Sequence, residues 1–247
     1  MKTRVLTAIL LIGIALGAIF APWKWPLLGL GFVLVGIGGH ELSKLLRSGA
    51  IVTVLAALAY AGFALGSDWS IGKGPYLALL AATLMLGFIG CLKKPLHSLS
   101  GLYLAAPLAA CVWLQQLGPL MLLLALVPVW AGDTAAIFAG RAWGKTKLMP
   151  TISPNKTWEG SAAHAVSAMA AGALLSTHNL GLGIAAGAIC TVFGQAGDLF
   201  ESYMKRRAGV KDSGTLLPGH GGVLDRIDAM LLTAVPVALL IYCWPAR

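Results

Sequence analysis

The sequence predicts an all-α polytopic membrane protein with about nine transmembrane helices, a cytoplasmic N-terminus and an extracytoplasmic C-terminus. Of its 247 residues, 58% are hydrophobic and 11% are charged, and a soluble domain of this size could not bury so much apolar surface. Apolar runs of about 17 to 20 residues recur along the chain, each long enough to cross a bilayer as a helix. The basic residues, which give a net charge of +9, fall between these runs. We therefore assign the positive charge to membrane orientation and not to nucleic acid.

The first two apolar runs, about 5–21 and about 26–45, follow each other closely. The first carries Lys2, Arg4 and a small-residue end, which is also the pattern of a removable signal peptide. The second begins almost at once, at Leu27, so we interpret both as spanning helices. Further spans are predicted near 50–66, 75–92, 101–116, 119–138, 158–176, 180–198 and 224–243.

The distribution of lysine and arginine supports this arrangement. With nine helices and a cytoplasmic N-terminus, only Lys24, Lys73 and Arg247 of the 18 basic residues lie outside. The two long polar connections, 139–157 and 199–223, are then both cytoplasmic. We divide the chain into N-terminal scaffold helices, 1–116, and a region that carries the candidate site, 117–247. The scaffold has few candidate site residues and is expected to provide the contacts of a homodimer.

Several isolated polar residues are interpreted as structural. The four cysteines stand alone within apolar segments, as small buried residues do. His40 and Glu41 lie where the second span leaves the membrane, and an interfacial role is favoured over a site. His97, His164 and His178 have no ligand spacing.

Three aspartates gather at the cytoplasmic ends of two predicted spans. Asp198 ends the eighth span, and Ser202 and Lys205 share its face if the helix continues. Asp225 and Asp228 share a face at the start of the last span. Carboxylates at a membrane edge are costly unless they are paired or bind a cation, and Mg²⁺ suits a few carboxylates with phosphate and water. We predict Asp198 and Asp225 as metal ligands, with Asp228 as a third ligand or as their support.

The segment between these acids has features that favour the binding of an anion. Gly219, His220, Gly221 and Gly222 directly precede a predicted helix, where glycines let the backbone approach a ligand and free amides favour an anion. Five side chains are candidates for holding phosphates in the reaction: Lys205, Arg206, Lys211, His220 and Arg226. Ser202, Gly221 and Gly222 are predicted to contact substrate. A loop that only fixes topology would explain the bases but not the aspartates and the glycine turn, so phosphoryl or nucleotidyl transfer is favoured.

These residues form a long pattern that resembles the signature of the phosphatidate cytidylyltransferase family, also called CDP-diacylglycerol synthases. The pattern runs Ser202-x-x-Lys205-Arg206, Lys211-Asp212-x-Gly214, Leu217-Pro218-Gly219-His220-Gly221-Gly222 and Asp225-Arg226-x-Asp228. The preceding connection resembles other motifs of that family: Gly132-Asp133-Thr134, Gly140-Arg141-x-x-Gly144-Lys145 and Ser153-Pro154-Asn155-Lys156-Thr157-x-Glu159-Gly160. The resemblance covers about 128–243 by motifs and the N-terminal half only by hydropathy and length.

The resemblance implies a reaction in which CTP and phosphatidate give CDP-diacylglycerol and pyrophosphate. It also implies Mg²⁺ and allows a second, monovalent cation such as K⁺. A multi-pass protein of the bacterial inner membrane with its active site facing the cytoplasm is expected. Which bases contact CTP and which contact the lipid stays open.

The second motif has structural and functional interpretations. Ser153 or Asn155 could cap the helix that starts near Thr157, with Glu159 in its first turn. The functional interpretation, which we favour for Asn155 and Lys156, places the motif against CTP. The predicted substrate-binding residues here are Ser153, Asn155, Lys156, Thr157, Glu159 and, from the preceding helix, Asp133. Asp133 contacts a cation or nucleotide, or pairs with Arg141; the sequence does not decide.

Two functions of other classes share some of these features. A transporter would place polar groups along the depth of the membrane, whereas here they crowd one side. A CTP-dependent lipid-alcohol kinase would transfer the γ-phosphate of CTP and release CDP. The products of the reaction separate these alternatives from cytidylyl transfer.

Overall fold

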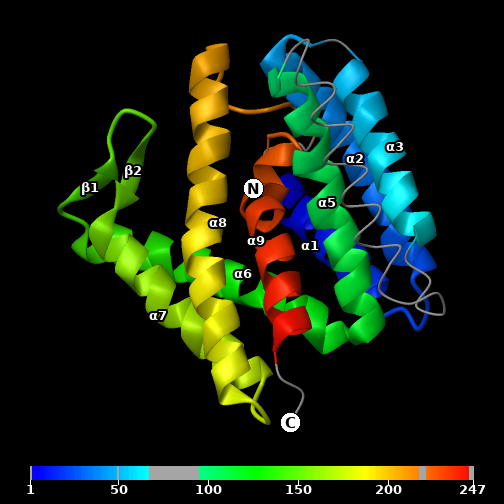
Figure 1. The fold of residues 1–247 in the computed structure, drawn as a ribbon. Helices are drawn as coiled ribbons and strands as arrows, with labels where there is room; N and C mark the ends of the chain where they lie inside the picture. Colours follow the sequence, from blue (N-terminus) through cyan, green and yellow to red (C-terminus); the bar gives the residue numbers. More distant parts are fainter. Residues whose placement is uncertain (1, 49, 67–94, 217–220, 245–247) are drawn as a thin grey trace. The chain divides into compact units, whose positions relative to one another are not determined.

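The computed structural model describes residues 2–48, 50–66, 95–216 and 221–244 (Figure 1). Within these ranges the chain is helical apart from one hairpin and its connections. The elements are α1 (Lys2–Ile19), α2 (Trp25–Leu46), α3 (Ile51–Gly66), α5 (Pro95–Leu117), α6 (Pro119–Trp143), β1 (Lys147–Met149), β2 (Ser153–Thr157), α7 (Trp158–Leu175), α8 (Leu180–Ala208) and α9 (Leu224–Cys243).

The helices match the apolar runs and present apolar side chains outward. Four of them, α2, α6, α8 and α9, are long and apolar enough to cross a membrane. Shorter apolar stretches occur in α1, α3 and α5. Leu58, Phe138 and Leu174 are each more than 60% exposed, which is unfavourable in water and natural against lipid. The helical membrane class is therefore supported, while the count of nine spans and the orientation stay predictions, and the run at 75–92 lies outside the described residues.

Two polar segments differ from their predicted form. α8 continues to Ala208, so the first part of the predicted connection 199–223 is helix. In the other connection, α6 runs on to Trp143, and β1 and β2 form an antiparallel hairpin with Lys147 opposite Thr157 and Met149 opposite Ser153. The hairpin was not predicted because its strands are short and mostly exposed, without the alternation of a half-buried strand.

The chain forms two compact units. The first contains residues 1–116 and 208–227, and the second contains residues 117–207 and 228–247. The first unit thus combines the N-terminal helices with a segment of the signature from the second half of the sequence. The helix α9 begins in the first unit and continues in the second.

In the first unit, α2 packs against α1, α3 and α5. The Tyr60 hydroxyl of α3 donates to the Leu28 carbonyl at 3.1 Å, and its ring meets Phe32 edge-on. The buried Gln115 amide of α5 donates to the carbonyls of Ala18, Ile19 and Ala21 at the end of α1. These carbonyls have no partner within their helix, so Gln115 satisfies groups that would otherwise be costly to bury.

In the second unit, α8 lies against α6, α7 and α9 (Figure 1). The backbones of α7 and α8 approach closely at Gly172 and Gly183. At Gly197 an added Cβ would lie 2.6 Å from the Asp228 carbonyl oxygen of α9. Small residues therefore allow close helix contacts beside the predicted aspartates.

The described cysteines only partly follow the prediction. Cys111 and Cys190 are buried, as expected, but Cys243 is exposed at the end of α9. Cys91 lies outside the described residues.

Candidate active site

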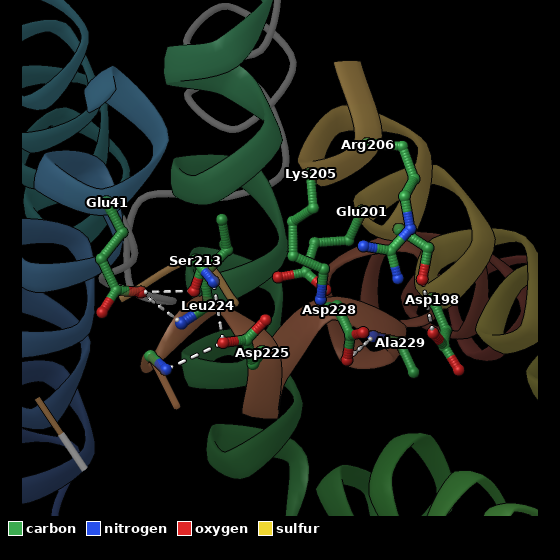
Figure 2. Close-up of polar contacts among 12 residues, drawn as sticks. Glu41, Asp198, Glu201, Lys205, Arg206, Ser213, Leu224, Asp225, Asp228 and Ala229 are labelled. Carbon is green, nitrogen blue, oxygen red and sulfur yellow. Dashed lines mark hydrogen bonds and ion pairs between the residues drawn. The ribbon is translucent and has the colours of Figure 1, made fainter. Parts of the chain in front are cut away.

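An acidic cluster in the second unit joins α8 and α9 (Figure 2). The Ser202 hydroxyl is 3.5 Å from Asp198 Oδ1, one turn along the same helix. Glu201 is fully buried, and Lys205 Nζ lies 2.5 Å from its Oε2. Asp198, Ser202 and Lys205 thus share one face of α8, as predicted. Lys205, however, pairs with Glu201, an acid that the sequence analysis did not select.

Asp228 on α9 lies within electrostatic range of this cluster. Its Oδ1 accepts from the Ala229 N–H at 2.8 Å. The charged groups that act on it from α8 are those of Asp198, Glu201 and Lys205. Burying carboxylates side by side is unfavourable without positive charge, so the cluster is suited to a cation.

A lysine of the second motif supplies positive charge to this cluster. Lys156 Nζ on β2 is 2.6 Å from Asp198 Oδ2. The hairpin is held to α8 a second time, because Arg206 Nε donates to the Ile152 carbonyl at 3.4 Å. A residue of the 153–160 motif therefore contacts α8 one turn before the signature begins at Ser202.

The carboxylates of the cluster are suited to Mg²⁺ as a pair and not as a complete ligand set. The described part of the chain contains no group of three or more His, Cys, Asp or Glu side chains arranged to hold a metal. Asp198 and Asp228 form a pair instead, with the Lys156 ammonium against one of them. Mg²⁺ commonly binds through one or two carboxylates and completes its shell with substrate phosphates and water. The pair fits that chemistry.

In the first unit, the Glu41 side chain of α2 points to Ser213, in the segment between α8 and α9 (residues 209–223, the signature loop), and to Leu224 at the start of α9 (Figure 2). Glu41 is 4% exposed. Its Oε1 accepts from Val223 N at 3.0 Å, and its Oε2 accepts from Leu224 N at 2.8 Å and from Ser213 Oγ at 3.0 Å. The carboxylate therefore caps the start of α9 from another helix.

Asp225 closes the same loop from within α9. Its Oδ2 accepts from Ser213 N at 3.0 Å and from Gly222 N at 2.8 Å. Gly221 has a φ of 82°, a left-handed conformation that glycine adopts without strain. A Cβ on Gly222 would collide with Ser213 Oγ and lie 2.6 Å from Glu41 Oε2. The two glycines are therefore needed for the shape of the loop.

The amides at this helix start already have partners. Gly222 donates to Asp225, and Val223 and Leu224 donate to Glu41. These three amides are therefore not free, contrary to the prediction from the sequence. Phosphate contacts by Gly221 and Gly222 stay predictions.

The helix cap of the second motif differs from the prediction. Thr157 is the N-cap of α7, and its hydroxyl accepts from Gly160 N at 3.1 Å. Ser153 and Asn155 instead belong to β2, so neither is the cap. Glu159 lies in the first turn as expected and accepts from Thr146 N at 3.2 Å, which ties α7 to the end of the hairpin. Thr157 can act as the N-cap because its backbone is extended and its short hydroxyl reaches a free amide of the first turn.

Asp133 has a partner that was not predicted. Its Oδ1 is 3.4 Å from Nε2 of the buried His164 on α7, whereas pairing with Arg141 had been the alternative to a ligand contact. His164 fills the space beside Gly132, where a Cβ would lie 2.5 Å from its ring. His164 is thus a packed residue of the interface between α6 and α7, as its isolation in the sequence indicated.

The remaining predicted residues are less defined by contacts. Lys211 and Arg226 are exposed. His220 lies outside the described residues, together with Leu217, Pro218 and Gly219. The roles of these side chains stay predictions.

Sequence reasoning missed Glu201 as a member of the cluster and treated Glu41 as interfacial. Glu201 had a local signal, because it stands three residues after Asp198 and four before Lys205 in one helix. Glu41 had none beyond being an acid at a membrane edge, since its partners are 172 to 183 residues away.

Comparison of the sequence with known proteins identifies the family of this chain. Residues 2–244 match the model of the cytidylyltransferase family. The chain is 36% identical over 270 residues to a phosphatidate cytidylyltransferase of Brucella suis, covering 100% of this chain and 93% of that protein. It is 34% identical over 255 residues to a phosphatidate cytidylyltransferase of Helicobacter pylori strain J99, covering 98% and 92%. A Bacillus subtilis protein of the same name is 45% identical over 123 residues, covering 48% and 46%.

Proposed function

We propose that this chain, which belongs to the cytidylyltransferase family, is a phosphatidate cytidylyltransferase. It transfers the cytidylyl group of CTP to phosphatidate and releases pyrophosphate. Full-length similarity to relatives of that name supports the substrates. The structural observation that carries the proposal is the contact of Lys156 with Asp198, which brings the 153–160 motif to the acidic cluster of α8 and α9.

The chemistry requires anions to be brought together. An oxygen of the phosphatidate phosphate attacks the α-phosphorus of CTP, the bond from that phosphorus to the bridging oxygen breaks, and pyrophosphate leaves. The attacking phosphate is already anionic at neutral pH, so neither a general base nor a covalent intermediate is needed. The barrier lies in alignment and in charge repulsion, which positioned cations reduce.

The residues of the cluster have separate roles in this proposal. Asp198 and Asp228 would hold Mg²⁺, which supplies positive charge to the CTP phosphates when bound. Lys156 keeps Asp198 neutralised before substrate arrives and then donates to a CTP phosphate. Glu201 fixes the position of Lys205 through their contact at 2.5 Å. Asp225 as a further ligand and K⁺ as a second cation are untested predictions.

The setting of the reaction follows from the predicted topology. We place the protein in the bacterial inner membrane with the site at its cytoplasmic face, where CTP is present and lysine and arginine are concentrated. Phosphatidate then reaches the site from the bilayer. A homodimer formed through the N-terminal helices is part of the proposal and is tested by the mass of the purified protein in detergent.

Labelled CTP distinguishes the proposed reaction from its alternatives. The purified protein is incubated with Mg²⁺, phosphatidate and CTP labelled at the α- or the γ-phosphate. Cytidylyl transfer moves the α-label into lipid and the γ-label into pyrophosphate. A γ-label in lipid after incubation with a lipid alcohol would indicate a kinase instead. Absence of turnover from a folded protein would refute the proposal.

A further inference from the structure

We propose that Glu41, on a helix remote in sequence from the signature, is a positioning residue of the active site. It holds the signature loop and the start of α9 in the conformation that presents Asp225. For its consequence on catalysis, the inference rests on the proposed function and on the prediction that Asp225 is a further metal ligand. The structural part concerns residues of the first unit alone.

Three hydrogen-bond donors converge on the Glu41 side chain. Glu41 is buried near the end of α2 and accepts from two successive amides, Val223 N and Leu224 N. It accepts also from the Ser213 hydroxyl, ten residues earlier in the chain than Val223. One carboxylate therefore joins both ends of the loop to α2.

Glu41 and Asp225 accept hydrogen bonds from the same or adjacent residues of the signature loop. Ser213 donates through its hydroxyl to Glu41 and through its N–H to Asp225, with both distances at 3.0 Å. At the other end of the loop, Gly222 donates to Asp225 and the next residue, Val223, donates to Glu41. The position of the Asp225 carboxylate is thus linked to Glu41 through two short backbone segments.

Two glycines of the signature loop lie against the Glu41 carboxylate. A Cβ on Gly214 would collide with Glu41 Oε1, and one on Gly222 would lie 2.6 Å from Oε2. The lack of a side chain at Gly214 and at Gly222 therefore leaves room for the Glu41 carboxylate. A glutamine could accept with only one of its two terminal atoms, and its NH₂ group would face an N–H or hydroxyl donor.

The test compares Glu41→Gln with a matched structural control. Gln115 is also a buried polar side chain of the first unit that binds distant backbone groups, but it binds the end of α1. Both variants are purified as monodisperse protein and assayed well below their Tm. We expect Glu41→Gln to lower kcat at least about tenfold while the KM values for CTP and phosphatidate change less than about threefold. Gln115→Met is expected to lower Tm and keep kcat.

A second variant tests the route through Ser213. Ser213→Ala removes the shared hydroxyl but keeps the N–H that binds Asp225. We expect a smaller loss of kcat, and no further loss when it is combined with Glu41→Gln. Losses that multiply in the double variant would overturn this route.

Hydrogen exchange provides a readout that does not depend on turnover. Peptides containing Val223 and Leu224 should exchange faster in Glu41→Gln than in the wild type or in Gln115→Met. Unchanged exchange, or a kcat within about threefold of wild type, would overturn the proposal. If the wild type transferred no cytidylyl group, the proposed function would fail, whereas the exchange data would still decide whether Glu41 holds the loop.

Discussion

Glu201 shows how single charges are accommodated beside the membrane. It is fully buried and would be costly alone, but Lys205 lies against it one helical turn away. Asp198 is neutralised in a different way, by Lys156 from the hairpin. Glu201 is thus paired within its own helix, whereas Asp198 is paired from a separate element, and in the proposed function it exchanges that partner for Mg²⁺.

At the residue scale, Asp228→Asn should reduce kcat on the order of 100-fold, because the neutral amide weakens the cation site. The amide is nearly isosteric, so expression and Tm should change little. The measurement is α-label transfer to lipid by purified protein. Asp68→Asn, in a connection predicted to be extracytoplasmic, is the matched control, and equal activity of the two variants would contradict the role of Asp228.

The variant Lys156→Met tests two proposed functions of the Lys156 ammonium, which are to neutralise Asp198 and to bind a CTP phosphate. In the wild type, Mg²⁺ competes with the Lys156 ammonium for Asp198, and the methionine variant removes this competitor. The Mg²⁺ concentration that half-maximally raises Tm should therefore fall about fivefold, which corresponds to ~1 kcal/mol of binding free energy. The KM for CTP should rise, because a phosphate contact is lost. Lys156→Arg should restore the KM at least in part. A need for more Mg²⁺ in the methionine variant would show that Lys156 supports the metal site instead of competing with it.

The site residues differ in how far sequence could identify them. Asp198, Asp228 and Lys156 were selected because acids and bases are rare in such an apolar chain and stand in a recognisable pattern. The cap at Thr157 was misassigned by a few residues, because Ser153, Asn155 and Thr157 are all good capping residues and only the strand β2 decides among them. Glu41 depends on contacts across more than 170 residues, which local patterns do not contain.

At the element scale, the separation of α8 from α9 sets the distance between the paired aspartates. Gly197 precedes Asp198, and its missing Cβ lets the Asp228 backbone approach. Helix ends were predictable where apolar runs stop, but α8 exceeded its run because Glu201 and Lys205 continue it as a paired polar helix.

Gly197→Ala should move α9 away from α8 and lower kcat about tenfold, with a loss of stability of about 1–3 kcal/mol from overpacking. Activity and Tm are measured in the same detergent. Gly36→Ala, in an exposed part of α2 with no atom within 4 Å of the new Cβ, should leave both unchanged or raise Tm slightly. Equal behaviour of the two variants would exclude a special role for the contact at Gly197.

At the scale of the whole molecule, the apolar runs predicted all the described helices, because membrane spanning imposes both a length and a composition. The hairpin was not foreseen. The membership of residues 208–227 in the unit of the N-terminal helices was likewise not visible in the sequence. Such pairing arises from contacts and not from order along the chain.

The predicted topology can be measured by cysteine labelling of intact cells. In a variant without the four native cysteines, Thr177→Cys in the turn after α7 should react with a membrane-impermeant maleimide from outside. Lys147→Cys in β1 should react only after the membrane is permeabilised. Labelling of both positions from the same side would contradict the assignment of α7 as a span.

The bonds from Glu41 to the start of α9 also bear on biosynthesis. Val223 follows Glu41 by 182 residues, so α2 has left the ribosome and entered the bilayer long before its partner is translated. Until then the nascent protein carries an acid in α2 without its final donors. Glu41 of α2 therefore gains its hydrogen-bond donors only when the start of α9 has been synthesised. Chains truncated before that point expose a carboxylate without these donors to the quality-control machinery of the cell.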